Sequence, residues 1–192
     1  MSRLVLTLLT LIACFATYGQ EHSKRWIENP LLQWADFEGE VKDTSRFDAE
    51  CFANVTYDYV FYSPNEFQFE VYANFDRYNS WRKKEMQSDE LLRHEQLHFN
   101  IAQLFADRLK FEFENYIYSE NYEAEIEEIF DKVKAAYHDM QNLYDEETNH
   151  SLNKEKQEEW EEYINDQLYN SKVKMEVVYQ DLPMKTGTYS AY

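Results

Sequence analysis

The spacing of apolar positions changes near residue 88, and this change separates two kinds of secondary structure. In Phe67–Ala73, apolar and polar side chains alternate with a period of two, which is typical of a strand with one buried face. Phe52–Tyr62 is rich in aromatic and β-branched residues, and the turn-forming stretch Ser63–Glu66 separates the two runs. The pattern therefore predicts an antiparallel hairpin.

After residue 88, apolar positions recur at spacings of three and four, which is typical of helices. Ser88 offers a capping hydroxyl, and Asp89 and Glu90 place two acids at the positive end of the helix dipole. We therefore expect a helix from here to about Tyr116. One face of this helix carries Leu91, His94, His98, Ile101, Phe105 and Leu109.

Two further helices and one more strand are predicted downstream. The apolar face of the first helix is made of Ile126, Ile129, Phe130, Val133, Tyr137, Met140 and Tyr144. The second helix starts near Asn153 and carries Gln157, Trp160, Ile164 and Leu168. Alternation over Val173–Tyr179 favours a strand. The fold class expected is α+β, a small antiparallel sheet followed by about three helices.

The composition limits the class of protein and its partners. Acidic residues outnumber basic ones by 37 to 19, so the chain is repelled by nucleic acids and anionic lipid surfaces. Glycine and proline are scarce, with three of each in 192 residues, which favours long regular elements. We expect one domain over residues 20–180, a loose tail over residues 181–192 and no membrane span.

The N-terminus has the pattern of an export signal. Arg3 precedes the apolar stretch Leu4–Ala16, and small residues follow, so residues 1–19 are predicted to be a signal peptide. A second interpretation makes Cys14 the lipid-anchored first residue of the mature chain. Cleavage after Gly19 leaves Cys51 without a partner for an internal disulfide. The protein is expected to be exported, to a periplasm or outside the cell.

The segment His94-Glu95-Gln96-Leu97-His98 carries the clearest chemistry. Two histidines four residues apart lie one helical turn apart on one face, so both imidazoles can bind one zinc ion. Glu95 lies about 100° round the helix and can activate a water without ligating the metal. The motif predicts His94 and His98 as zinc ligands and Glu95 as the general base.

A catalytic zinc site needs a third protein ligand and one open position. Three residues are candidates on the sequence alone. His150 lies at the break between the second and third predicted helices, His138 lies within the second helix, and Glu127 matches a glutamate-ligand spacing with Asp131. Tyr144 or His138 is a candidate to stabilise an oxyanion.

Several segments in and around the motif resemble one family of proteins. Leu91–Ala102 resembles the signature of a bacterial family of uncharacterised exported proteins described as secreted zinc-dependent proteases of the zincin-like type. Further segments are similar in the same order: Trp34–Gly39, Ser80-Trp81, and Tyr144-Asp145 with Thr148 and His150, followed by Gln157 and Trp160. The resemblance implies that His150 is the third zinc ligand. His150 is followed by Ser151, where the family motif has glycine.

Together these features predict an exported zinc metallopeptidase that hydrolyses peptide bonds in a peptide or protein substrate. Zinc bound by His94, His98 and His150 would polarise the scissile carbonyl, and Glu95 would take a proton from water. The alternative is a non-catalytic exported protein, with a structural zinc or with a role in contacts at the cell envelope.

Overall fold

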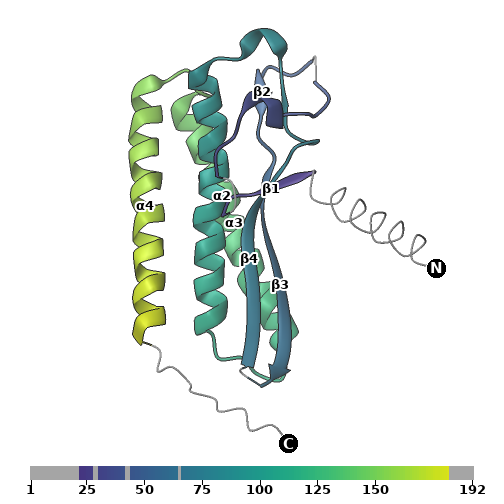
Figure 1. Ribbon diagram of the computed structural model, residues 1–192, viewed down its shortest axis with the longest axis vertical. Helices are drawn as coiled ribbons and strands as arrows, with labels where there is room; N and C mark the ends of the chain where they lie inside the picture. Colours follow the sequence, from purple (N-terminus) through teal and green to yellow (C-terminus); the bar gives the residue numbers. More distant parts are fainter. Residues whose placement is uncertain (1–21, 28–29, 42–43, 65, 182–192) are drawn as a thin grey trace, which may run out of the picture.

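A long β-hairpin and three long helices make up the molecule in this computed structural model (Figure 1). The structure describes residues 22–27, 30–41, 44–64 and 66–181, with side chains as far as residue 171. The predicted signal peptide, with Cys14, and residues 182–192 of the predicted tail lie outside the described residues. The small antiparallel sheet and three helices confirm the expected α+β fold class.

The hairpin consists of β3 (Ala53–Ser63) and β4 (Glu66–Asp76), paired in the register Ala53↔Phe75 to Phe61↔Phe67. The predicted alternation is confirmed, because Phe67, Phe69 and Val71 face the helices while their polar neighbours face outward. The short strand β1 (Ser23–Arg25) pairs with the other edge of β4 and completes a three-stranded antiparallel sheet.

A second, two-stranded sheet lies above the hairpin. β2 (Ala49–Glu50) pairs with β5 (Trp81–Arg82), and the buried Trp81 donates its indole N–H to Glu50 at 2.7 Å. The short helices η1 (Trp34–Asp36) and η2 (Lys84–Met86) flank this sheet. Gly39 fits closely against its neighbours, because a Cβ at this position would lie 2.7 Å from the backbone oxygen of Ser80.

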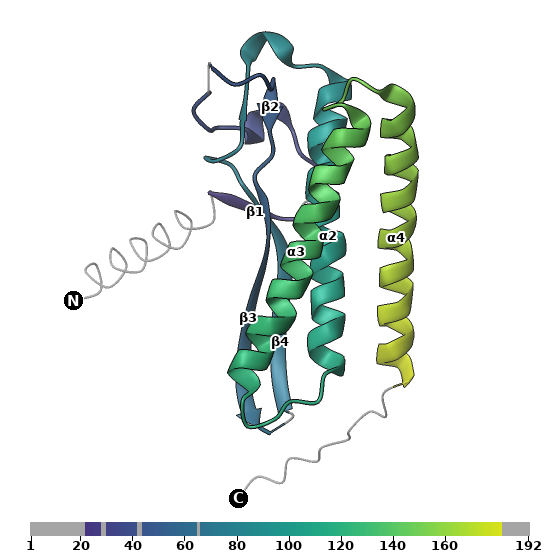
Figure 2. The same ribbon diagram turned by 180° about the vertical axis from the view of Figure 1, so that it is seen from behind.

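The three helices are α2 (Asp89–Asn115), α3 (Tyr122–Thr148) and α4 (Lys154–Asp181). The predicted cap of α2 is confirmed, since the Ser88 hydroxyl accepts a hydrogen bond from the backbone N–H of Leu91. In both views α2 lies between the hairpin and α4, and α3 crosses beside it (Figures 1 and 2). The central position of α2 explains why twelve of its residues are buried.

The strand predicted over Val173–Tyr179 is wrong, because these residues continue α4 to Asp181. Four alternating apolar positions are a weak signal, and no glycine or proline interrupts the sequence from Lys154 to Asp181. Among the residues that the structure describes, no helix is both long and apolar enough to cross a membrane.

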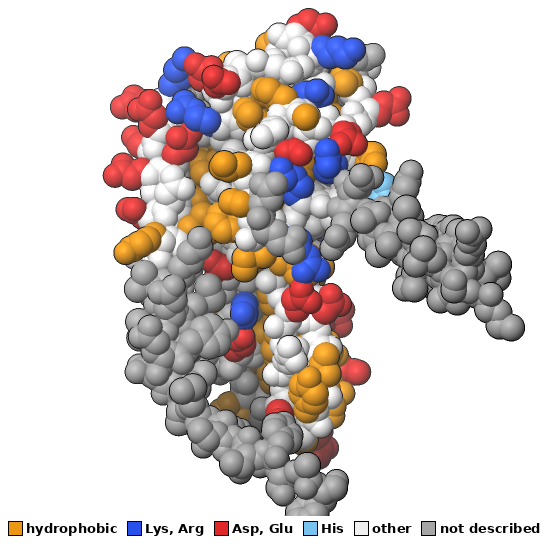
Figure 3. Space-filling view, in the orientation of Figure 1, with side chains coloured by type: hydrophobic (Ala, Val, Ile, Leu, Met, Phe, Trp, Pro, Cys, Tyr) orange, Lys and Arg blue, Asp and Glu red, His pale blue; other side chains and the backbone are white. Residues whose placement is uncertain are grey.

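The charged surface and the core follow the sequence pattern. Acidic side chains cluster on the outer side of α4 in Figure 3, where Glu155, Glu158, Glu159 and Glu162 are exposed. One continuous hydrophobic core joins the hairpin to the helices, and its largest fully buried side chains include Phe75, Phe99 and Phe113. The core packs against α2 from the hairpin and from the other two helices. The N-terminal half of the α2 helix, held in this way, carries His94 and His98.

Candidate metal centre

His94 and His98 lie on the same face of α2, one turn apart, as the spacing predicts. His94 is buried and His98 is nearly so, with 3% and 12% of their side chains exposed. Their Nε2 atoms lie 3.3 Å apart, and the two rings are close to perpendicular. Both imidazoles therefore direct the same nitrogen toward one point.

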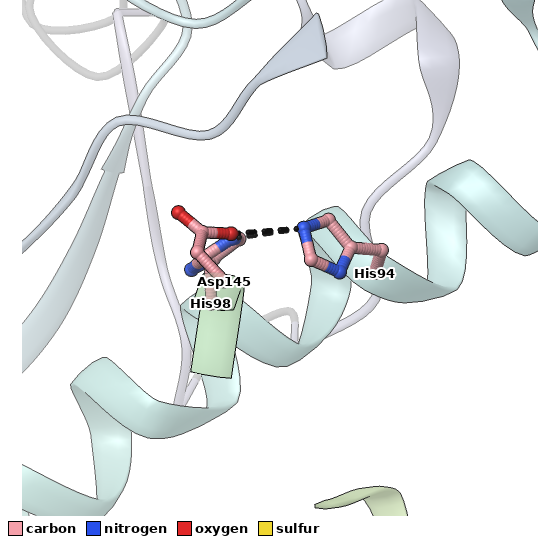
Figure 4. Close-up of side chains that lie close together, drawn as sticks. All are labelled: His94, His98 and Asp145. Atoms are coloured by element: carbon pink, nitrogen blue, oxygen red, sulfur yellow. Dashed lines mark hydrogen bonds and ion pairs between the residues drawn. The ribbon is translucent and has the colours of Figure 1, made fainter. Parts of the chain in front are cut away.

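Asp145, in the last turn of α3, completes the group. Its Oδ1 lies 3.1 Å from Nε2 of His94 and 3.1 Å from Nε2 of His98, and Figure 4 shows the carboxylate over the His98 ring with a dashed line to His94. The ligand atoms of the three residues lie within 4.8 Å of one another. His94, His98 and Asp145 thus form a group that could bind a metal ion.

The opposite nitrogen of each ring contacts a glutamine. Nδ1 of His94 lies 3.2 Å from Oε1 of Gln157 on α4, and Nδ1 of His98 lies 2.5 Å from Oε1 of Gln141 on α3. The fully buried Tyr144 ring stacks on His94 with centroids 4.7 Å apart. Side chains from α3 and α4 therefore fix the orientation of the two imidazoles on α2.

The three groups shift one another's protonation. Burial opposes ionisation of Asp145, but its contacts with His94 and His98 outweigh burial and hold its pKa far below the usual range. Burial lowers the pKa of His94. Burial also acts to lower the pKa of His98, but the Asp145 carboxylate outweighs it and the pKa is raised. Asp145 is therefore an ionised carboxylate, the form that binds a cation.

Glu95 lies beside this group and is itself buried, with 3% of its surface exposed. Burial raises the pKa of Glu95 to about 7, although the backbone N–H of Cys51 donates a hydrogen bond to the carboxylate and acts to lower it. A carboxylate with a pKa near neutrality can both take up and release a proton under physiological conditions. The structure thus places a proton acceptor next to the candidate metal ligands.

These residues open onto a cleft of about 570 Å³. One wall is the continuous stretch of residues 46–54, which includes β2, and the opposite wall comes from α2 and α3. Glu95, His98, His138, Asp145 and His150 all line it. The cleft is of the size that holds a small molecule or a few residues of a peptide.

His150 lies in the turn after α3, just outside the three-residue group. Its Nδ1 lies 3.4 Å from Oδ1 of Asp145, and its ring packs against Phe47 with centroids 4.5 Å apart. The backbone here is strained, because Asn149, His150 and Ser151 all have positive φ, of 48°, 50° and 75°. The turn brings His150 to the cleft beside Asp145.

The other two candidates for a third ligand differ in position. His138 lines the cleft, and its ring contacts Tyr137. Glu127 is exposed near the start of α3, about 27 Å along the helix axis from Asp145. Tyr144 does not present its hydroxyl to the cleft, because that hydroxyl is buried 2.7 Å from Oε1 of Gln157.

Sequence reasoning missed Asp145 as a candidate ligand. The residue is one of 37 acids, and no spacing rule links it to the histidines, which lie about 50 positions earlier. A signal was present, since half-buried Asp145 directly follows Tyr144, which shares a buried face of α3 with Tyr137 and Thr148. An acid beside a buried helix face is rarer than an acid on an exposed one.

The fold and the site define an α+β protein with a candidate metal centre between its helices. The chain belongs to a family of bacterial proteins of unknown function (DUF922), whose model matches residues 34–151. No protein of curated function and no solved structure matches the chain. The matched range includes the hairpin, the histidines, Asp145 and His150, and ends before Gln157 on α4.

Proposed function

We propose that this chain is an exported metallopeptidase that binds one zinc ion through His94, His98 and Asp145 and uses Glu95 as its general base. The observation that carries the proposal is the triangle formed by Nε2 of His94, Nε2 of His98 and Oδ1 of Asp145. Its sides are 3.3, 3.1 and 3.1 Å long. All three atoms accept hydrogen bonds when both imidazoles carry hydrogen on Nδ1 and the carboxylate is ionised. A cation at their centre would satisfy all three.

The types of the three ligand atoms and the distances between them both fit zinc. Ligand atoms of a tetrahedral zinc ion at about 2.0–2.1 Å lie about 3.3–3.4 Å from one another. The observed triangle is close to one face of such a tetrahedron. Imidazole nitrogens favour zinc and related transition metals, whereas calcium and magnesium prefer an all-oxygen site. Three protein ligands at a cleft also leave room for water or substrate.

Glu95 carries the proton transfer in this proposal. Zinc, when bound, supplies a Lewis acid that polarises a carbonyl and lowers the pKa of water. Glu95 takes the proton from the attacking water, because its carboxylate lines the same cleft as His98 and Asp145. The same residue then gives that proton to the leaving amine. The substrate class is a peptide or protein outside the cytoplasm.

A closed structural zinc site is the competing function. Such a site uses four protein ligands and excludes water. Among the described residues, the group of potential metal ligands contains three members and lies at a cleft. A third view treats both histidines as core residues with satisfied hydrogen bonds. It leaves each ring with an acceptor oxygen at both nitrogens, whereas a neutral imidazole has a single hydrogen to donate.

Metal content is the first test. The purified protein is expected to contain about one zinc per chain by plasma mass spectrometry, with manganese, iron and cobalt measured in the same run. The variant His94→Ala/His98→Ala is expected to contain none. A wild-type protein that remains free of metal after incubation with zinc would contradict the proposal.

Catalysis needs a separate test with a variant that keeps the ligands. Glu95→Gln is expected to retain zinc and to lose at least about 100-fold in the hydrolysis of a peptide library, because the general base is gone. Glu90→Gln, an exposed change in the first turn of the same helix, is the matched control. Equal hydrolysis by wild type and Glu95→Gln would leave Glu95 without a catalytic role.

A further inference from the structure

The orientation of Gln157 can be assigned from its partners. Its Nε2 donates to Oε1 of Glu161 at 3.0 Å, and the Tyr144 hydroxyl donates to its Oε1 at 2.7 Å. The reversed amide would place two oxygens 3.0 Å apart at Glu161, which is repulsive, since a carboxylate only accepts. The oxygen of Gln157 therefore faces Nδ1 of His94.

Gln141 is fixed in the same way by the backbone. Its Nε2 donates to the carbonyl oxygen of His98 at 3.0 Å, and its Oε1 faces Nδ1 of the same residue. A backbone carbonyl accepts and never donates, so the amide cannot be reversed without losing this hydrogen bond. One glutamine thus contacts both the backbone and the ring of His98.

Both glutamine oxygens only accept, so each Nδ1 must carry a hydrogen. A neutral imidazole has one such hydrogen, and Nε2 of each histidine is then a bare lone pair. The competing tautomer is favoured by Asp145, whose Oδ1 lies 3.1 Å from each Nε2 and would accept a hydrogen from it. That tautomer would place a hydrogen in the space proposed for the ion.

We propose that Gln141 and Gln157 are positioning residues, which hold both histidines in the tautomer with hydrogen on Nδ1 and so prepare the site for a metal. The proposal rests on the proposed function for the identity of the ion. Gln157 also makes the site depend on α4, because it lies on this helix and contacts His94. The residue lies beyond the range that the family model matches. The burial of Gln157 and Tyr144, with 3% and 0% exposed, shields these contacts from water.

Histidine tautomers can be measured without any metal. At a pH where both imidazoles are neutral, long-range ¹H–¹⁵N spectra of the EDTA-treated wild-type protein are expected to show hydrogen on Nδ1, and none on Nε2, of both His94 and His98. Gln157→Leu is expected to move His94 to the Nε2–H tautomer, and Gln141→Leu to do the same for His98. Each change is expected to weaken zinc binding by about 10–100-fold, as is typical for residues that contact a ligand.

Three further variants test whether the effects of Gln141→Leu and Gln157→Leu come from the lost acceptor oxygen or from a disturbed fold. Gln141→Glu keeps an acceptor oxygen at Nδ1 of His98 but gives up the hydrogen bond to the His98 carbonyl, so it is expected to keep the wild-type tautomer and to bind zinc more tightly than Gln141→Leu. The exchange Gln157→Glu/Glu161→Gln keeps donor and acceptor in reversed order and is expected to do the same for His94, relative to Gln157→Leu. Gln103→Leu removes a buried amide of α2 that bonds to Asp107, and it should change neither tautomer nor affinity.

Unchanged tautomers in folded Gln141→Leu and Gln157→Leu proteins would overturn the proposal, as would a zinc affinity of these variants that stays within twofold of wild type. Equal loss of affinity in Gln141→Leu and Gln141→Glu would also overturn it, because the acceptor oxygen would then be irrelevant. Absence of metal uptake by the wild-type protein contradicts the proposed function, and the spectra of the metal-free sample decide the tautomers independently.

Discussion

The two halves of α2 differ in what surrounds them. The N-terminal half presents His94 and His98 to polar side chains, and each contact there is directional and short. The C-terminal half presents Phe113 to the rings of Tyr57 and Phe69, with centroids 5.1 and 4.7 Å apart. One helix therefore serves a candidate metal centre at one end and an aromatic core at the other.

The difference separates function from stability. Aromatic packing lowers the free energy of the folded chain in proportion to the apolar area buried and needs only an approximate shape. A metal site needs several atoms at fixed distances, and buried polar groups stabilise the fold little while they lack a cation. Substitutions in the two halves should therefore change different quantities.

The largest effect is expected at Asp145. Asp145→Ala removes one of the three ligand atoms and should lower zinc affinity by more than about 100-fold, beyond the loss typical of a residue that only contacts a ligand. Titration with zinc in a competing chelator measures it. Asp139→Ala changes an exposed acid of the same helix and should bind zinc like wild type. Similar affinity in both variants would remove Asp145 from the site.

Phe113→Ala tests the other half of α2. Phe113 is 1% exposed, so its truncation should reduce the free energy of unfolding by about 3–5 kcal/mol, with zinc affinity unchanged. Chemical denaturation in EDTA gives the stability. Phe111→Ala, at a residue that is 47% exposed, should cost less than about 0.5 kcal/mol. Loss of zinc affinity in folded Phe113→Ala protein would show that the two halves are coupled.

His150→Ala tests whether His150 is a zinc ligand, as the resemblance to the bacterial family implies. The resemblance predicts His150 as a ligand, whereas its Nδ1 lies 3.4 Å from Oδ1 of Asp145 and outside the three-residue group. We expect zinc affinity to fall by no more than about tenfold, the lower end of the range for a residue that contacts a ligand, because the contact of His150 with Asp145 is long and its side chain is 37% exposed. A loss as large as that of Asp145→Ala would make His150 a metal ligand.

Ser151→Gly should have the smallest effect. Ser151 has a φ of 75°, a conformation that costs a residue with a Cβ about 1–2 kcal/mol. Glycine relieves this cost but gains freedom in the unfolded chain, so a net stabilisation of about 0.5 kcal/mol is expected from thermal unfolding. Ser151→Ala keeps the Cβ and should give no gain. Destabilisation by glycine would mean that the Ser151 side chain itself stabilises the turn.

Local sequence patterns predicted most of the fold. The period of two gave the hairpin, Ser88 gave the start of α2, and the spacing of His94 and His98 placed both on one helical face. The strand expected over Val173–Tyr179 failed because four alternating residues match a helix as easily as a strand. Each success depended on interactions between residues that are close in the sequence.

By itself, then, the sequence determined the two histidines, the adjacent Glu95 and the helix that presents them, because an i, i+4 relation is a property of one helix. Only the tertiary structure decided which acid joins them, and it brought Asp145 to within 3.1 Å of both Nε2 atoms. It also brought Gln141 and Gln157 to the opposite nitrogens. These contacts join three helices, and the packing of helices sets their distances, which no spacing along the chain records.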